Sequence, residues 1–216
     1  MHFEILVEDQ SGKKFLDILI PKIIGDQCTF RVHPYKGIGR IPKTINSHKE
    51  AKHRILLEQI PRLLRGYGKT FSSYSVDCPA CLIVVCDLDN KSISEFKTQL
   101  NSILYSCHPQ PETCFCFAVE EGESWLLGDI NAIKIAYPQA KDNVLNSYVN
   151  DSICGAWEKL ADAVYNGGSS KLSSLGWHAV GAEKSVWAEK ISPHMDINNN
   201  LSPSFNYFRR KLLDMK

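Results

Sequence analysis

Acidic residues follow three strand-like stretches of this 216-residue chain. The stretches and the acids behind them are Phe3–Val7 with Glu8, Ala80–Cys86 with Asp87 and Asp89, and Thr113–Val119 with Glu120, Glu121 and Glu123. The ligand crevice of an open α/β sheet lies outside the carboxyl ends of its parallel strands, so these carboxylates would meet there. Crowded carboxylates repel one another unless a cation joins them, and Mg²⁺ and Mn²⁺ prefer oxygen ligands. The sequence therefore predicts a site for Mg²⁺ or Mn²⁺.

The spacing of the acids supports this prediction. Alternate side chains of an extended segment share a face, so Asp87 and Asp89 would point the same way while Leu88 points to the opposite side. Glu121 and Glu123 have the same spacing. The alternative is that these acids form turns and stabilise the positive N-terminal ends of helices. That alternative explains each cluster separately, whereas one cation site explains all three together.

Strand and helix patterns alternate through most of the chain. Apolar runs predict strands near residues 3–7, 28–35, 80–86 and 113–119. Helical periodicity and capping patterns predict four helices: at 11–24 with Ser11 as the cap, from Ser47 with Glu50 until Pro61 bends or ends it, from Ser92 with Glu95, and at 123–136. Strands that alternate with helices predict an α/β fold with a mostly parallel four-stranded sheet flanked by helices.

The C-terminal part of the chain has helical patterns without further strand signals. We expect a helix at about 151–165, capped by Asp151, and another at about 204–213. Four large aromatic side chains in this part need burial, namely Trp157, Trp177, Trp187 and Phe205. We therefore expect two units: an α/β domain at 1–138 and a helical C-terminal extension at 139–216, packed on the same core.

Charge is strongly segregated along the chain. Residues 31–69 hold ten Lys or Arg and two acids, a net charge of +8, whereas the whole chain has only +1. A basic segment beside an acidic metal crevice suits a polyanion such as nucleic acid. The residues we expect to contact it are Lys36, Arg40, Lys43, Lys49, Lys52 and Arg54. The alternative is that these residues form an ordinary solvated helix face.

The composition suits a cytoplasmic protein. The sequence has no apolar run of the roughly 18 to 20 residues that cross a bilayer, and it begins with a strand pattern instead of a signal segment. Several of the eight cysteines lie within apolar strand runs, as expected of buried thiols in a reducing compartment. Cys78 and Cys81 form a lone C-x-x-C pattern, which is either half of a zinc site, a redox pair, or simply core and loop cysteines.

Three segments of the chain resemble a known family. Leu6–Leu16, which contains Glu8, and Val84–Asn90, which contains the Asp-x-Asp pattern, resemble the Toprim domain of topoisomerases, DnaG-type primases and overcoming-lysogenization-defect (OLD) nucleases. Phe117–Asp129 is similar to the third block of small bacterial Toprim-like proteins related to the OLD nucleases. The resemblance covers roughly residues 1–130, and in that smaller group it extends to Gly181–Glu189 and Ser202–Phe205.

The resemblance implies roles for the acidic residues. It implies that Glu8, Asp87 and Asp89 are magnesium-associated, and that Glu121 and Glu123 are second-metal ligands as in OLD-type nucleases. Many Toprim domains have glycine after the first glutamate, whereas this chain has Asp9, which would crowd the turn or supply another ligand.

A hydrolytic activity fits this chain best among those of the family. A topoisomerase needs a nucleophilic tyrosine in a large additional domain, and a primase usually needs further template-binding modules. Hydrolysis of phosphodiester bonds needs only this core and a substrate groove. We therefore expect a metal-dependent nuclease of DNA or RNA. Lys184 would neutralise charge developing on the phosphate, and the alternative is that it is an ordinary exposed lysine.

Two other functions remain open. The chain has no G-x-x-x-x-G-K-[ST] motif, while related OLD systems join a Toprim nuclease to an ATPase. The chain would then be the effector subunit of a bacterial defence or toxin-like system, with a separately encoded ATPase as partner. The main alternative is a non-catalytic nucleic-acid-binding or regulatory partner of such an ATPase. The third is an enzyme for a nucleotide or another phosphorylated small molecule.

Overall fold

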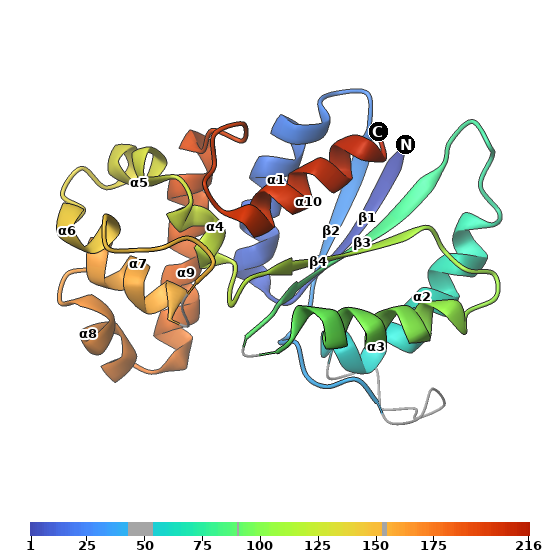
Figure 1. The fold of residues 1–216 in the computed structure, drawn as a ribbon, viewed down its shortest axis with the longest axis horizontal. Coiled ribbons are helices and arrows are strands. Elements are labelled where there is room, and N and C mark those ends of the chain that lie inside the picture. Colours follow the sequence, from blue (N-terminus) through green and yellow to red (C-terminus); the bar gives the residue numbers. More distant parts are fainter. Residues whose placement is uncertain (43–53, 90, 153–154) are drawn as a thin grey trace.

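A computed structural model describes residues 1–42, 54–89, 91–152 and 155–216 of the chain. Four strands form one sheet in the order β2-β1-β3-β4, and all three pairings are parallel. The strands are β1 (His2–Val7), β2 (Thr29–Pro34), β3 (Ala80–Asp87) and β4 (Thr113–Ala118). Helices cover the sheet (Figure 1), which confirms the predicted α/β class with a four-stranded parallel sheet.

The helices fall into two groups along the chain. Those before the last strand are α1 (Gln10–Ile24), α2 (Leu56–Phe71) and α3 (Ile93–Tyr105). Those after it are α4 (Glu123–Leu127), α5 (Ile130–Ala136), α6 (Asp142–Leu145), α7 (Ala156–Val164), α8 (Gly168–Ser174), α9 (Trp177–Ile191), the 3₁₀ turn η2 (Ser192–His194) and α10 (Pro203–Asp214). No helix within the described ranges is long and apolar enough to cross a membrane.

The two faces of the sheet are covered by different helices (Figure 1). Successive side chains of a strand point to opposite faces. In β1, Phe3 and Ile5 therefore join the core under α1 and α10, whereas Leu6 joins the core under α2 and α3. Both faces are apolar, as expected of parallel strands that are covered on both sides.

The C-terminal helices share a core with the sheet. Leu160 of α7, Leu172 of α8 and Trp187 of α9 belong to the same buried cluster as Phe3 and Ile5 of β1. Helices α5 to α8 lie together beyond one end of the sheet, and α9 packs against α1 (Figure 1).

One of the four aromatic residues expected to be buried is not. Trp157, Trp187 and Phe205 are buried, but Trp177 is 80% exposed, so the expectation was wrong for this residue. Trp177 is the first residue of α9, beyond the turn that ends α8, and its ring lies 6.2 Å from the ring of Trp157 between centroids.

Several predicted boundaries also differ from the structure. The N-cap of α1 is Asp9 rather than Ser11. Helix α2 continues through Pro61, because the burial of Pro61 and Ile60 in the core offsets the backbone hydrogen bond that proline cannot make. The single helix expected at 123–136 is divided, because the side chain of Asp129 caps α5 through the Ala132 N–H.

Three predicted caps have different outcomes. The Ser92 cap of α3 is confirmed. Ser47 and Glu50 lie outside the described residues. The N-cap of α7 is Gly155, not Asp151, whose carboxylate instead accepts hydrogen bonds from Ser202 and Ser204 at the start of α10. A left-handed backbone at Asp151, with a φ of 56°, turns its side chain toward α10.

Candidate functional site

The ends of β1 and β3 form the centre of the candidate site. The chain places β2 on one side of β1 and β3 on the other, so the direction of strand order changes between β1 and β3. Such a switch point is where ligands bind in open α/β sheets. Val7 pairs with Val85 at this edge, which brings Glu8 and Asp87 to neighbouring positions beyond the strands.

A small cavity at this edge gathers candidate residues from four parts of the chain. Its free volume for water-sized spheres is about 30 Å³, enough for a water or a small ion. Glu8 follows β1, Asp87 ends β3, Glu123 begins α4 and Lys184 comes from α9, and all four line the cavity. The fold therefore brings together four of the predicted site residues.

Lys184 is the cation at the centre of this cluster. Its Nζ lies 2.9 Å from Glu121 Oε2 and 3.0 Å from Glu123 Oε2. Only 16% of its side chain is exposed, so the residue is far less accessible than an ordinary surface lysine. Burial lowers the pKa of the Lys184 ammonium, but Glu123 and Glu121 outweigh it and raise this pKa well above its usual value. Lys184 thus stays protonated at every physiological pH.

The carboxyls of the cluster bind protons more tightly than ordinary carboxyls. Burial, followed by the charges of Asp9 and Asp89, raises the pKa of Glu8 to about 7. Burial likewise raises the pKa of Glu123 to about 7, although Lys184 lowers it in part. The pKa of Asp87 is raised well above its usual value, first by burial and then by the charge of Glu8.

The acidic cluster has fewer positive charges than carboxylates. Glu8 Oε2 is buried and has no hydrogen-bond partner in the described part of the chain. Within the described residues, neither Glu8 nor Asp87 has a Lys, Arg or His at salt-bridge distance, because Lys184 is engaged with Glu121 and Glu123. A cation that joined these carboxylates would relieve both the repulsion and the missing contact.

Asp89 lies at the rim of the site and does not line the cavity. We expected it to point the same way as Asp87, which requires an extended backbone. Instead Asp89 has a left-handed φ of 48°, and its carboxylate pairs with Lys91 at 2.6 Å. Its side chain is 51% exposed, yet its charge still contributes to the raised pKa of Glu8.

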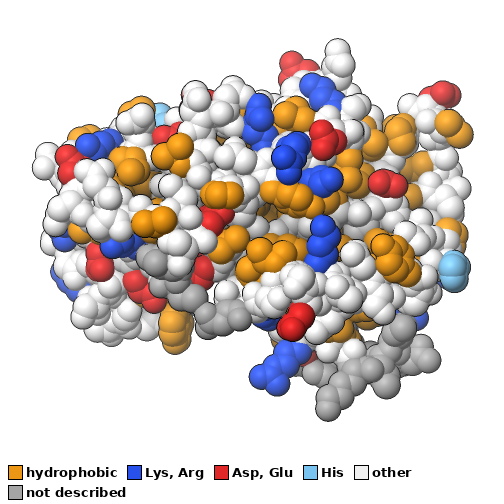
Figure 2. Space-filling model, in the orientation of Figure 1, with side chains coloured by type: hydrophobic (Ala, Val, Ile, Leu, Met, Phe, Trp, Pro, Cys, Tyr) orange, Lys and Arg blue, Asp and Glu red, His pale blue; other side chains and the backbone are white. Residues whose placement is uncertain are grey.

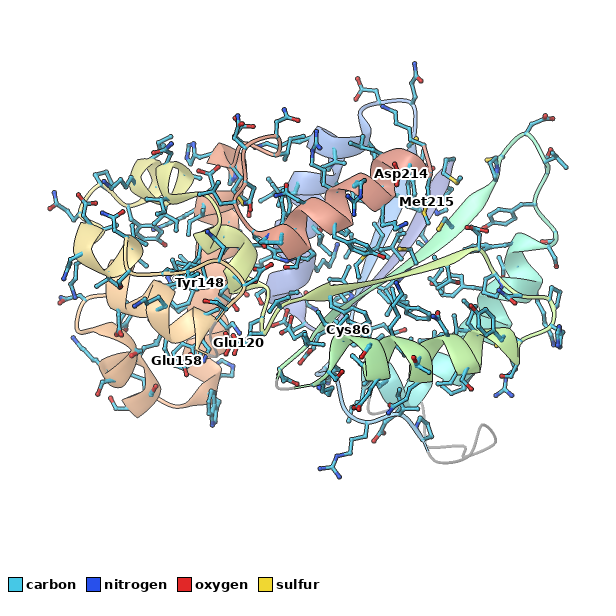
Figure 3. The ribbon with its side chains drawn as sticks, in the orientation of Figure 1. Cys86, Glu120, Tyr148, Glu158, Asp214 and Met215 are labelled. Carbon is cyan, nitrogen blue, oxygen red and sulfur yellow. The ribbon has the colours of Figure 1, made fainter. Side chains whose placement is uncertain are left out.

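Two neighbouring acids serve as helix caps. Glu120 has a left-handed φ of 69°, and its carboxylate accepts hydrogen bonds from the N–H groups of Gly155 and Ala156 at the start of α7. Figure 3 shows Glu120 at the junction between the sheet and the C-terminal helices. Asp9 lines the cavity, but its Oδ1 accepts the Gly12 N–H at 2.7 Å and caps α1. The alternative interpretation of the clustered acids as helix-capping residues thus applies to Glu120, whereas Asp9, expected to crowd the turn or to supply another ligand, is the N-cap of α1.

The described part of the basic segment lies partly beside the cavity. The Gly37 N–H donates to Glu8 O at 3.0 Å, which ties the loop after β2 to the site, and the side chains of Lys36 and Arg40 in this loop are exposed. Arg54 donates to Pro34 O at 2.8 Å. Three of the predicted nucleic-acid contacts, Lys43, Lys49 and Lys52, lie outside the described residues.

The cluster offers oxygen ligands but is not a finished metal site. Within the described ranges, no group of three or more His, Cys, Asp or Glu side chains is placed to hold a metal ion. The carboxylates of Glu8, Asp87 and Glu123 nevertheless have the donor chemistry that Mg²⁺ and Mn²⁺ prefer.

The C-x-x-C pattern is divided between surface and core. Cys78 is exposed, whereas Cys81 is buried with its Sγ 3.4 Å from Met215 Sδ. Burial raises the pKa of the Cys81 thiol above its usual range, which opposes the thiolate form that zinc binding and redox exchange require.

Sequence reasoning missed part of the cavity wall. Ser11, Gly12 and Trp125 line the cavity beside the acids. A Cβ atom on Gly12 would lie 2.5 Å from Val7 Cγ2, so the close approach of α1 to β1 requires glycine there. The Asp9-Gln-Ser-Gly12 segment was a usable signal, because Asp is a favoured N-cap.

No curated protein and no solved structure shows significant similarity to this chain. One family model, described as a domain of unknown function (DUF4276), matches residues 7–213. The match includes the acidic cluster, strands β2 to β4 and the C-terminal helices, so the chain belongs to the DUF4276 family.

Proposed function

We propose that this protein is a metal-dependent phosphodiesterase that cleaves DNA or RNA, with a Toprim-like core. The observation that carries the proposal is the convergence of Glu8, Asp87 and Glu123 at the switch point of the sheet, where Lys184 is the one cationic side chain that lines the cavity among the described residues. Structural carboxylates are normally placed in water or fully paired, so a buried and underpaired group of them is typical of a functional site.

The residues of the cluster would have distinct roles. Glu8, Asp87 and Glu123 would hold Mg²⁺ or Mn²⁺, and Asp89 and Glu121 are candidates for further ligands. Such a cation, when bound, supplies Lewis acidity toward a phosphate oxygen and lowers the pKa of a coordinated water. Lys184, which stays protonated, would place its charge beside the scissile phosphate.

The basic residues would hold the rest of the polyanion. Lys36 and Arg40 are exposed in the loop whose Gly37 N–H donates to Glu8 O, and in this proposal their charges would guide a polyanion toward the cavity. We extend this proposal to Lys43, Lys49, Lys52 and Arg54, which complete the basic segment. Phosphate contacts of this kind give affinity that falls steeply with salt.

We also propose a cellular context. The described cysteines are free thiols, and Cys81, Cys86, Cys107, Cys114 and Cys116 are buried, which suits the reducing cytoplasm. The protein would act there as an effector subunit with a separately encoded ATPase.

A cleavage assay tests the proposal. The wild type is incubated with single-stranded and duplex DNA and RNA, with Mg²⁺ or Mn²⁺, alone and with the proteins encoded beside it. We expect cleavage by the wild type and a loss of at least about a hundredfold in Asp87→Asn, since a metal ligand is removed. Asp142→Asn is the matched control, because this exposed carboxylate lies on α6.

The outcomes separate the proposal from its alternatives. Equal cleavage by Asp87→Asn, in a preparation with an unchanged circular dichroism spectrum, would refute the proposed site. A wild type that binds nucleic acid and stimulates a neighbouring ATPase, yet cuts nothing under any condition, would favour the non-catalytic partner instead.

A further inference from the structure

The outer edge of β4 has backbone groups without a strand beside them. Among the strands that the structure describes, β4 is last in the order, with β3 on its inner side. The Leu82 N–H donates to Glu112 O at 2.9 Å, and the Leu88 N–H donates to Ala118 O at 2.9 Å. Since the N–H and C=O of one residue in a parallel ladder point to the same side and alternate along the strand, the even-numbered residues of β4 face β3.

The odd-numbered residues therefore face outward. They are Thr113, Phe115 and Phe117, followed by Val119 just after the strand. These outward backbone groups could also form hydrogen bonds beyond those of the sheet itself. Among the described residues, the Val119 N–H is the only one that has such a bond, and it donates to Ser204 Oγ at 3.4 Å. An open edge of this kind is a template for pairing with another extended chain.

An apolar groove of about 450 Å³ runs along this open edge, between α3 and α10. We name it the edge groove; its apolar wall consists of Ile93, Phe115, Phe117, Val119, Pro203 and Tyr207. Ile93 is 46% exposed. Figure 2 shows hydrophobic side chains gathered in the middle of this face, with lysine and arginine side chains beside them.

Three cations surround the ring of Tyr207 at the groove. Lys97 Nζ lies 5.8 Å, Arg210 Cζ 5.8 Å and Lys211 Nζ 5.6 Å from the ring centroid. None of the three forms a salt bridge with another residue in the described part of the chain. The rim of the edge groove thus has a net positive charge, although the groove wall also contains one carboxylate, that of Asp151, which accepts hydrogen bonds from Ser202 and Ser204.

We propose that the edge groove binds an extended segment of another protein, in which apolar residues alternate with Asp or Glu, as a strand added beside β4. The outward N–H and C=O groups of Phe115 and Phe117 would pair with its backbone. Because side chains alternate along a strand, one set would fill the apolar groove and the other would meet the basic rim. Asn150 Oδ1 is buried beside the groove, has no hydrogen-bond partner among the residues that the structure describes, and offers a further acceptor.

A second copy of this chain is a poorer occupant. Pairing two β4 edges about a twofold axis would bring two basic rims together, and like charges facing each other oppose association. A segment of opposite charge has no such penalty. The proposal depends only on this edge and not on the acidic cavity.

The test begins with a display library of random twelve-residue peptides, screened against the full-length protein. We expect the enriched peptides to alternate apolar and acidic residues. Amide exchange followed by NMR then locates them: without peptide, the amide hydrogens of Phe115 and Phe117 exchange faster than those of Cys114 and Cys116, and saturating peptide slows the faster pair.

Charge variants test the rim. The double variant Lys97→Glu/Lys211→Glu should bind the enriched peptides at least about tenfold more weakly than the wild type, which corresponds to about 1.4 kcal/mol. Ile93→Glu, at an exposed position of the groove, should lower the affinity for these peptides as well. Lys141→Glu is the matched control, because this exposed lysine precedes α6, away from β4, and should bind like the wild type.

Four results would overturn the proposal. The first two are a screen without enriched peptides, and enriched peptides that leave the amide exchange of Phe115 and Phe117 unchanged. The third is a set of charge variants that have a native NMR spectrum and bind the peptides like the wild type. The fourth is protection of this edge by self-association or by an oligonucleotide instead of a peptide.

Discussion

Lys184 and Glu123 form an ion pair of 3.0 Å between Nζ and Oε2, with only 16% and 5% of the two side chains exposed. The pair joins α9 to the start of α4, two elements that are far apart in the sequence. Removing one partner of a buried pair leaves an uncompensated charge, which costs more than the intact pair contributes. Lys184 therefore acts as the internal counter-ion of the acidic cavity.

Replacing this counter-ion should destabilise the metal-free protein. We expect Lys184→Met to lower the free energy of unfolding by about 3 kcal/mol near pH 8, because Glu121 and Glu123 lose their cation. Urea denaturation followed by circular dichroism measures the change. Lys190→Met, an exposed lysine on the same helix, should change it by less than about 1 kcal/mol.

A double variant checks that the effect comes from the pair. Lys184→Met combined with Glu123→Gln should cost less than the sum of the two single variants, because the uncompensated charge is removed. If the two changes in the free energy of unfolding simply added up in the double variant, the two residues would not interact.

Stability of the metal-free protein should fall as the pH rises from about 4.5 to about 7. Burial raises the pKa of Glu8 and of Glu123 to about 7, so the folded state binds these protons more tightly than the unfolded chain. Their contribution to stability is complete below the unfolded pKa of 4.5 and is lost as the pH rises through about 7. Each group adds a slope of at most about 1.4 kcal/mol per pH unit in this window.

Urea denaturation at a series of pH values, with EDTA present, measures this slope. Glu8→Gln and Glu123→Gln should each flatten it, because the amide does not titrate. Glu112→Gln, at an exposed position before β4, should leave the slope unchanged. A wild type whose stability is constant between about pH 5 and about pH 8 would contradict the prediction.

A divalent cation should stabilise the fold through Asp87. Binding to the native state alone raises the free energy of unfolding by about 2.7 kcal/mol when the free ion is at a hundred times its dissociation constant. We expect Mg²⁺ or Mn²⁺ to raise the thermal midpoint of the wild type near pH 8 and to have little effect on Asp87→Asn. Asp142→Asn should respond like the wild type. If neither Mg²⁺ nor Mn²⁺ changed the thermal midpoint of the wild type, the result would argue against the metal site.

The strands and the position of the site could be predicted because they depend on local signals. Ala80–Cys86 is apolar throughout, and burial on both faces of a parallel sheet is the ordinary reason for such a run. Once β1 and β3 are parallel neighbours, the residues after them must lie at one edge. Glu8 and Asp87 therefore follow from the strand pattern alone.

The directions of individual side chains could not be predicted in this way. Asp89 and Glu120 both have left-handed backbones, and the Asp89 N–H donates to Glu120 O at 3.2 Å. This contact joins two loops that follow different strands, so neither loop sequence specifies it. It turns Glu120 toward α7 and Asp89 toward the rim, which separates them from Asp87 and Glu123.

The surroundings of Lys184 likewise depend on tertiary packing. The sequence around this lysine does not indicate burial. Its position is fixed by α9, which packs against α1 and places Lys184 between Glu121 and Glu123. The same packing leaves Trp177 at the exposed start of α9, where the preference of tryptophan for burial gave the wrong expectation.

The exposure of Trp177 gives a direct test of how the C-terminal helices pack. Trp125 and Trp187 are fully buried and Trp157 is 5% exposed, so an aqueous quencher such as acrylamide should reach Trp177 almost alone. Trp177→Phe should therefore remove most of the quenchable fluorescence, while Trp187→Phe should remove fluorescence that acrylamide does not reach. Stability should change by less than about 1 kcal/mol in Trp177→Ser, because an exposed side chain loses little packing, but by about 3–5 kcal/mol in Trp187→Ala. If Trp177→Ser cost as much as Trp187→Ala, the start of α9 would be covered in solution and its exposure here would be wrong.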